Sequence, residues 1–207
     1  MPWLFLLAYT CSGLAGLIYE VSWTRLLTLY VGHTTAAASA VVGAFLGGLA
    51  IGAAAGGRWA ATLTRRQSLL AYIALELAVA VLAIILPLEL RALTPVLQWA
   101  YADGQSTVLF PLVRLSACLL MVFIPAAALG ATFPVATRWF ASDAADPARA
   151  SGWLYALNTG GAAIGALLAG FLLIPTPSIT DAVSPIVGIR RKPASSAPIA
   201  APAVLSA

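Results

Sequence analysis

Residues 34–57 read TTAAASAVVGAFLGGLAIGAAAGG, and this run of 24 residues between His33 and Arg58 contains no charged side chain. A helix rises about 1.5 Å per residue, so such a run would be about 36 Å long. That length is enough to cross a hydrocarbon core of about 30 Å with some tilt. The stretch therefore predicts a helix that crosses a membrane.

Glycines in this stretch recur at intervals of four residues. They form two series, Gly43 with Gly47, and Gly48 with Gly52 and Gly56. Glycine at every fourth position lets the backbone of a neighbouring helix come close, which is how helices associate inside lipid. We predict that all five glycines are helix-packing residues, and that Gly161 and Gly165 play the same part in a later segment.

The composition of the whole chain agrees with a membrane protein. Hydrophobic residues make up 61% and charged residues only 9%, with a mean hydropathy of +0.96, whereas a soluble domain has about a quarter charged residues. The basic residues are scattered and form no basic face with interleaved aromatics, which argues against nucleic-acid binding. Cys11 and Cys118 lie in apolar runs and are interpreted as small buried hydrophobes.

Five apolar segments follow one another along the chain. Because they are continuous and do not alternate over about ten residues, they favour helices over the strands of a membrane barrel. The first is interpreted as a retained helix, since no basic region precedes it. The predicted fold is an all-α integral membrane protein, with a transmembrane domain at 1–175 formed by helices at about 3–30, 35–57, 68–88, 107–139 and 151–174.

Orientation is predicted from arginines in the short loops. The loops after the second and fourth segments carry most of them, which places the N-terminus in the cytoplasm and the 31–34 and 90–106 loops outside. Trp99 and Tyr101, in the second of these outer loops, suit an interfacial position. Residues 176–207 are rich in Pro, Ala and Ser, and a disordered tail is expected there.

Ionisable residues at membrane depth are costly and are candidates for function. Glu20 and Arg25 lie in the first segment, and Arg114 lies in the fourth. We expect Glu20 to pair with Arg114 or with Arg25 near the outer leaflet. Such a pair would either fix the register of the helices or form a substrate or proton site, and both interpretations stay open.

Glu76 lies about 12 Å into the third segment, near the expected midplane. Asn158 in the fifth segment is at a similar depth, so a hydrogen bond between them is expected. It would serve either as packing or as part of a ligand or proton site. Pro125 and Pro134 are expected to kink or unwind the fourth helix.

Several kinds of chemistry have no candidate residues in the sequence. The chain has one histidine, His33, and one lysine, Lys192, and no cluster with metal-ligand spacing. It has neither of the glycine-rich nucleotide-binding motifs. No catalytic residue, cofactor or metal is therefore predicted.

Four sequence motifs, in this order along the chain, resemble those of one protein family. They look like the membrane domain of bacterial spermidine synthase-like proteins, in which transporter-like helices are fused to an aminopropyltransferase domain. The motifs are residues 12–25 (SGLAGLIYEVSWTR), 47–52 (GGLAIG, leading to Gly57-Arg58), 130–134 (GATFP) and 154–162 (LYALNTGGA).

The resemblance implies a bundle similar to half of a major-facilitator transporter, in the bacterial inner membrane. The Rossmann-like catalytic domain of longer members has no counterpart here, so the chain alone is not expected to be an enzyme. Two departures stand out. Ala60-Ala61 replaces an acidic residue that tends to follow Gly57-Arg58, and the low-complexity tail, which suggests a truncation or a changed reading frame, replaces a further helix after Pro175.

Three functions are compatible with these features. The first is a non-catalytic structural or accessory subunit of a larger membrane complex, whose partners are the lipid bilayer and either other membrane subunits or a second copy. The second is a transporter-like half-bundle for polyamines or other small solutes. The third is a membrane anchor for a separately encoded aminopropyltransferase.

Overall fold

The computed structural model describes residues 2–31, 35–101 and 109–173, and all secondary structure in these ranges is helical. Five helices are long and apolar enough to cross a membrane, as the apolar segments predicted. The predicted tail at 176–207 lies outside the described residues. The helices are α1 (Pro2–Val31), α2 (Thr35–Thr62), α3 (Arg65–Tyr101), α4 (Leu109–Phe140) and α5 (Pro147–Leu168), followed by a short π-helical segment, η1 (Ala169–Leu173).

Helix α3 begins three residues before its predicted start because a capping box precedes it. The Thr64 N–H donates to the Gln67 side-chain oxygen at 2.9 Å, while the Gln67 N–H donates to the Thr64 hydroxyl at 3.4 Å. This reciprocal pair satisfies two backbone donors that a helix start leaves free.

Helix α3 also ends later than predicted, since it continues through Pro87 and Pro95 as far as Tyr101. The prediction of an outer loop at 90–106 is therefore wrong for residues 90–101, and Trp99 lies on the helix with an exposed side chain. The 37 residues of α3 would extend about 55 Å, more than the hydrocarbon core requires. Residues 102–108 lie outside the described part.

Two further boundaries differ from the prediction. Helix α4 runs as one α-helix through Pro125 and Pro134, so the expected local unwinding does not occur. Helix α5 starts at Pro147, four residues early, because Asp146 caps it by accepting from the Arg149 N–H at 3.0 Å. An aspartate followed by proline is a common helix start.

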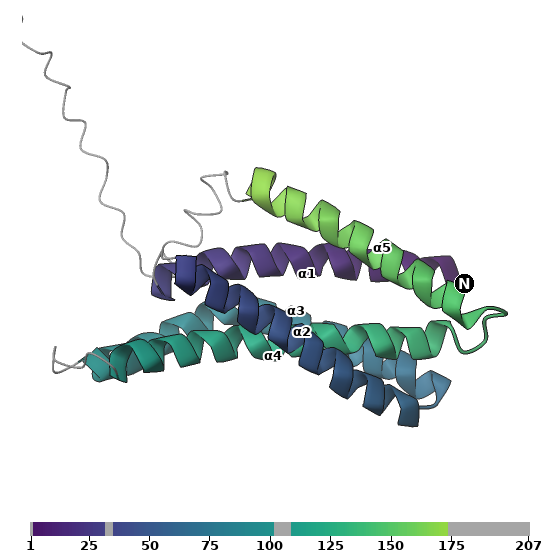
Figure 1. Cartoon of the computed structure of the whole chain (residues 1–207), viewed down its shortest axis with the longest axis horizontal. Coiled ribbons are helices and arrows are strands. Elements are labelled where there is room, and N and C mark those ends of the chain that lie inside the picture. The colour runs from purple at the N-terminus through teal and green to yellow at the C-terminus, as the bar shows by residue number, and fades with distance from the viewer. Residues whose placement is uncertain (1, 32–34, 102–108, 174–207) are drawn as a thin grey trace, which may run out of the picture.

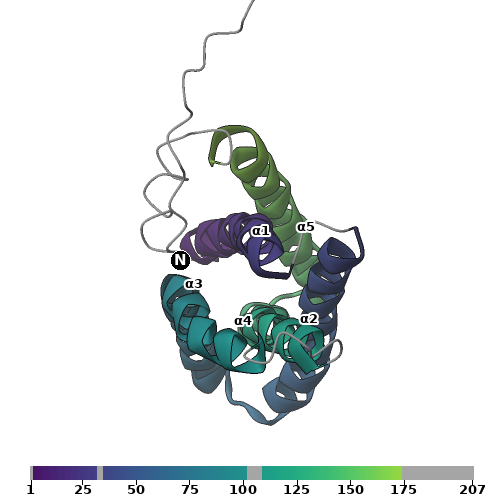
Figure 2. The same cartoon turned by 90° about the vertical axis from the view of Figure 1, so that its left-hand side faces the viewer.

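The helices form two groups. Helix α1 lies along α5, while α4 lies between α2 and α3, as both views of the chain show (Figures 1 and 2). The N-terminus, the α2–α3 connection and the α4–α5 connection lie at the same end (Figure 1).

Glycines bring α2 and α4 into backbone contact. A Cβ atom at Gly52 would collide with the backbone of Ala127, and one at Gly56 would lie 2.7 Å from the Ala131 Cα. Gly48 lies in the same way against α4, with Ala126 Cβ only 2.8 Å from such an added atom. The packing role predicted for this series of glycines is confirmed.

The other predicted series on α2 does not pack within the chain. A Cβ atom added at Gly43 or Gly47 would meet no atom within 4 Å. Within the described chain these two glycines have no neighbouring helix, so their predicted packing role stays a prediction. The two series lie on different faces of α2, because Gly47 and Gly48 are adjacent and about 100° apart around a helix.

Helices α1 and α5 are joined in the same way as α2 and α4. Gly161 lies against the backbone of Thr10, and Gly165 lies against that of Leu14. Gly13 on α1 completes the contact by lying against Asn158. The packing role of Gly161 and Gly165 is confirmed.

Two clusters of buried apolar side chains connect the two groups of helices. One lies toward the end that carries the N-terminus and includes Phe5 and Tyr72; the other lies toward the opposite end and includes Trp23 and Leu90. Away from these clusters α3 exposes an apolar stripe with helical spacing, suited to contact with lipid. The stripe comprises Leu70, Ile73, Leu77, Val81, Ile84 and Leu88.

Candidate functional site

A carboxylate and several hydroxyl groups meet between the two apolar clusters. The Ser12 hydroxyl on α1 donates a hydrogen bond of 2.6 Å to Oε1 of Glu76 on α3. Ser12 lies about 15 Å from the start of α1, and Glu76 lies about 16 Å from the start of α3. Both residues therefore sit well inside the apolar spans.

Further hydroxyls surround this pair. Tyr72, one turn before Glu76 on α3, is hydrogen-bonded to the same carboxylate. Tyr9, one turn before Ser12 on α1, is hydrogen-bonded to Thr132 on α4, and its ring centroid lies 5.8 Å from that of Tyr72. Three helices thus contribute one carboxyl and four hydroxyl groups to this set, which we call the Glu76 cluster.

Aromatic rings close the cluster on the side toward the N-terminus. The Phe5 ring centroid lies 5.2 Å from that of Tyr72 and 4.3 Å from that of Trp139, and the Tyr9 and Tyr72 centroids are 5.8 Å apart. Ring pairs at these distances add to the stabilisation from apolar burial. They fix Tyr9 and Tyr72, and so position their hydroxyls near Glu76.

Asn158 does not bond to Glu76, so the expected hydrogen bond between them is wrong. Glu76 takes Ser12 as its partner, while Asn158 lies against Gly13, the next residue on α1. Successive residues on a helix point about 100° apart. Helix α1 therefore stands between the two polar groups, with Ser12 turned to α3 and Gly13 turned to α5.

The second predicted polar site is only partly assembled. Glu20 on α1 is half-buried, and the Arg114 guanidinium lies 5.1 Å from the centre of the Phe110 ring. No ion pair joins Glu20 to Arg114 among the residues that the structure describes. The reason is depth, since Glu20 lies about 16 Å from the end of α1 and Arg114 only about 8 Å from the start of α4. Pairing of Glu20 with Arg25, whose side chain is exposed, stays a prediction.

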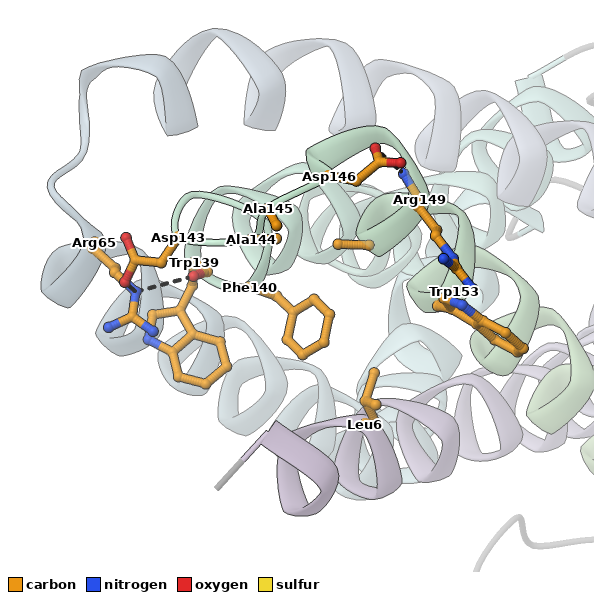
Figure 3. Close-up of a pocket in the computed structure, with 11 residues that line it drawn as sticks. Leu6, Arg65, Trp139, Phe140, Asp143, Ala144, Ala145, Asp146, Arg149 and Trp153 are labelled. Atoms are coloured by element: carbon orange, nitrogen blue, oxygen red, sulfur yellow. Dashed lines mark hydrogen bonds and ion pairs between the residues drawn. The ribbon is translucent and has the colours of Figure 1, made fainter.

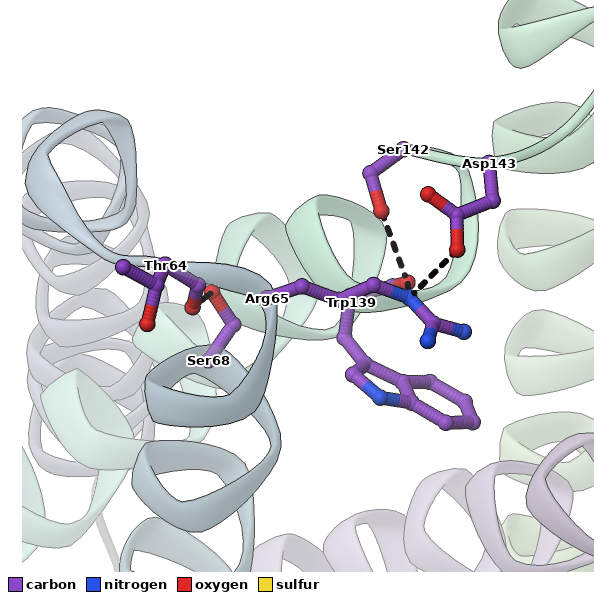
Figure 4. A network of polar contacts seen from close by, with 6 residues as sticks. All are labelled: Thr64, Arg65, Ser68, Trp139, Ser142 and Asp143. Carbon is purple, nitrogen blue, oxygen red and sulfur yellow. Dashed lines mark hydrogen bonds and ion pairs between the residues drawn. The ribbon is translucent and has the colours of Figure 1, made fainter.

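At the end that carries the N-terminus, Arg65 links the α2–α3 and α4–α5 connections. Its Nε lies 3.0 Å from Oδ2 of Asp143 and donates to the Trp139 carbonyl at 3.3 Å (Figure 4). Its guanidinium also lies 5.1 Å from the centre of the Trp139 ring. A return contact comes from Arg138, which donates to the Leu63 carbonyl at 3.2 Å. The two basic loops are thus held at the same end.

An open pocket of about 640 Å³ lies beside this network. Arg149 and Trp153 on α5 form one side, Arg65 and Asp143 form the other, and Leu6 and Phe140 lie between them (Figure 3). Two arginines and two aspartates line the pocket; Asp143 pairs with Arg65, while Asp146 accepts a hydrogen bond from the backbone N–H of Arg149. The pocket is lined by both apolar and polar side chains.

Ser12, Tyr9, Tyr72 and Thr132 were not predicted as site residues from the sequence. A hydroxyl side chain in an apolar helix is common and does not by itself indicate a functional site. Spacing did offer one clue, since Tyr72 precedes Glu76 by four residues and therefore shares its helical face.

No family model, curated protein or solved structure matches the chain. The described part of the chain defines its class: five helices long and apolar enough to cross a membrane, with the Glu76 cluster between the two groups of helices.

Proposed function

We propose that this chain is a non-catalytic, multi-pass membrane domain that acts as a structural or accessory subunit of a larger membrane complex. The observation that supports the proposal is the open face of α2. Gly43 and Gly47 have no neighbour within 4 Å of an added Cβ, and Ala50 and Ala54 continue the face with exposed side chains.

The spacing of this open face is that of a helix–helix contact. Intervals of four, three and four residues keep its members on one side of α2. Inside lipid, close approach over small residues is a main source of helix association. Because Gly48, Gly52 and Gly56 already hold α4, the open face is free to take a transmembrane helix of another subunit.

The experiment is copurification from native membranes in mild detergent, with mass spectrometry of the companions. Gly47→Leu places a bulky side chain on the open face without touching α4, and we expect it to release the companion. Gly160→Leu is the matched control, because Gly160 also has no neighbour within 4 Å but lies on α5. A wild-type chain that purifies as a monomer without a companion would contradict the proposal.

A second candidate is a transporter-like half-bundle for polyamines or other small solutes. The Glu76 cluster favours it, since a carboxylate is placed between the two groups of helices at membrane depth. Uptake of a labelled polyamine by membranes with wild-type protein or Glu76→Gln tests the idea. Unchanged flux in the variant would remove it.

We also propose that the chain is related to the membrane domain of spermidine synthase-like proteins, in the bacterial inner membrane with its N-terminus in the cytoplasm. Contacts between the four sequence motifs support this. Gly13 of the first motif lies against Asn158 of the fourth, and Gly130 of the third lies against Leu49 of the second. The motifs thus pack against one another in two pairs. The proposal includes the similarity to half of a major-facilitator bundle.

A further inference from the structure

The Glu76 carboxylate lacks a cationic partner within the described chain. Its hydrogen-bond partners are the hydroxyls of Ser12 and Tyr72, which are neutral. An ion pair joins Arg65 to Asp143 at the end of the bundle, away from Glu76. A carboxylate in an apolar setting is costly unless its charge is neutralised.

The polar groups of the Glu76 cluster are all oxygen atoms and come from three helices. Helix α1 contributes Ser12 and Tyr9, α3 contributes Tyr72, and α4 contributes Thr132. The titratable groups that face Glu76 in the described chain are thus the two tyrosines. Oxygen ligands suit small hard cations, and a single carboxylate neutralises one positive charge only.

We propose that the Glu76 cluster is a binding site for one monovalent cation, either a proton or a sodium ion. In either case the positive charge neutralises the carboxylate, to which the hydroxyls of Ser12 and Tyr72 are hydrogen-bonded. This inference does not depend on the proposed subunit role, because it concerns the interior of the bundle and not the open face of α2.

The position of the site gives the cation a structural effect. The Ser12–Glu76 bond joins α1 of one helix group to α3 of the other, in the layer between the two apolar clusters. A cation bound in this layer stabilises the assembled bundle by mass action. The stability of the protein should therefore follow the concentration of that cation.

The test is thermal unfolding of the full chain in nanodiscs. One arm varies sodium against choline chloride at fixed pH and ionic strength. The other varies pH in sodium-free buffer, below the range in which tyrosine titrates. We expect the melting temperature to rise and saturate with sodium, which assigns a sodium site, or to rise as pH falls, which assigns a proton site. An absence of both responses in the wild-type chain would overturn the proposal.

Two variants link the response to the cluster. Glu76→Gln keeps the shape of the side chain, and we expect it to remove the response. Glu89→Gln, on the same helix but outside the cluster, should keep it. Ser12→Ala retains the carboxylate and should shift the midpoint of the response by about tenfold, because it removes a hydrogen bond to a charged group.

The variants also provide the outcomes that count against the site. A cation response that survives in Glu76→Gln would overturn the proposal. If Glu76→Gln fails to fold, Ser12→Ala decides the question, and an unshifted midpoint in that variant would overturn it.

Discussion

Gly52 on α2 and Ala127 on α4 lie so close that a single methyl group on the glycine would collide with the alanine backbone. Gly48 and Gly56 repeat this contact one turn before and one turn after. Nine residues before Gly52, Gly43 faces open space. One helix thus carries two glycine faces, one occupied within the chain and one open.

Gly52→Ala should lower the stability of the protein, while Gly43→Ala should not. The added methyl at position 52 must push α4 away, at a cost of about 1 to 3 kcal/mol for an overpacked contact. At position 43 alanine only favours the helix, a gain of up to about 1 kcal/mol. Denaturant unfolding in detergent micelles compares the two. Equal effects would show that α2 and α4 are not packed through Gly52.

The contact between α1 and α5 allows a comparison of adjacent residues. Gly161→Ala should destabilise by about 1 to 3 kcal/mol, because its methyl would collide with the Thr10 backbone. Gly160→Ala meets no atom within 4 Å and should be neutral or slightly stabilising. The same unfolding measurement applies. A larger loss for Gly160→Ala would mean that α5 is rotated from the orientation described.

The predictions that succeeded are those that depend on local sequence. Uninterrupted apolar runs indicated five spans, and four-residue spacing identified Gly48, Gly52 and Gly56 as a packing face. The same spacing could not show that Gly43 and Gly47 lack a partner within the chain. That outcome depends on how α2 is rotated relative to α4, which spacing along one helix does not specify.

The partner of Glu76 was mispredicted for a related reason. Depth along the helices placed Asn158 level with Glu76, but depth does not say which helix stands between them. Helix α1 occupies that place, and Ser12 takes the bond. The length of α3 was mispredicted because the predicted helix ended with the apolar run at residue 88, whereas the helix continues through Glu89, Arg91 and Pro95 to Tyr101.

Thr64→Ala should loosen the first turn of α3. The Thr64 hydroxyl accepts from the Gln67 N–H and holds the Gln67 side chain, and loss of such a cap costs about 1 kcal/mol. Hydrogen exchange should rise at residues 65–68. Thr62→Ala is a control, because the Thr62 hydroxyl donates to the Trp59 carbonyl at the end of α2. Unchanged exchange in Thr64→Ala would contradict the capping box.

The ion pair between Arg65 and Asp143 should contribute little. Both side chains are more than a third exposed, and pairs of this kind are worth about 0.2 to 1 kcal/mol. A double-mutant cycle with Arg65→Gln and Asp143→Asn should give a coupling in this range that falls as salt is added. A coupling well above this range that persists in high salt would show that the pair is shielded from water.

The most direct test of the whole account is cysteine accessibility in sealed membrane vesicles. Cys11 is exposed and is first replaced by alanine, whereas Cys118 is buried and can stay. Ala61→Cys and Ala144→Cys lie at the basic end of the bundle and Leu77→Cys lies on the apolar stripe of α3.

We expect a charged, membrane-impermeant reagent to label Ala61→Cys and Ala144→Cys from the same side of the vesicle, and to leave Leu77→Cys unlabelled from either side. Labelling of Leu77→Cys by that reagent, or labelling of Ala61→Cys and Ala144→Cys from opposite sides, would contradict a bundle that crosses the bilayer as described.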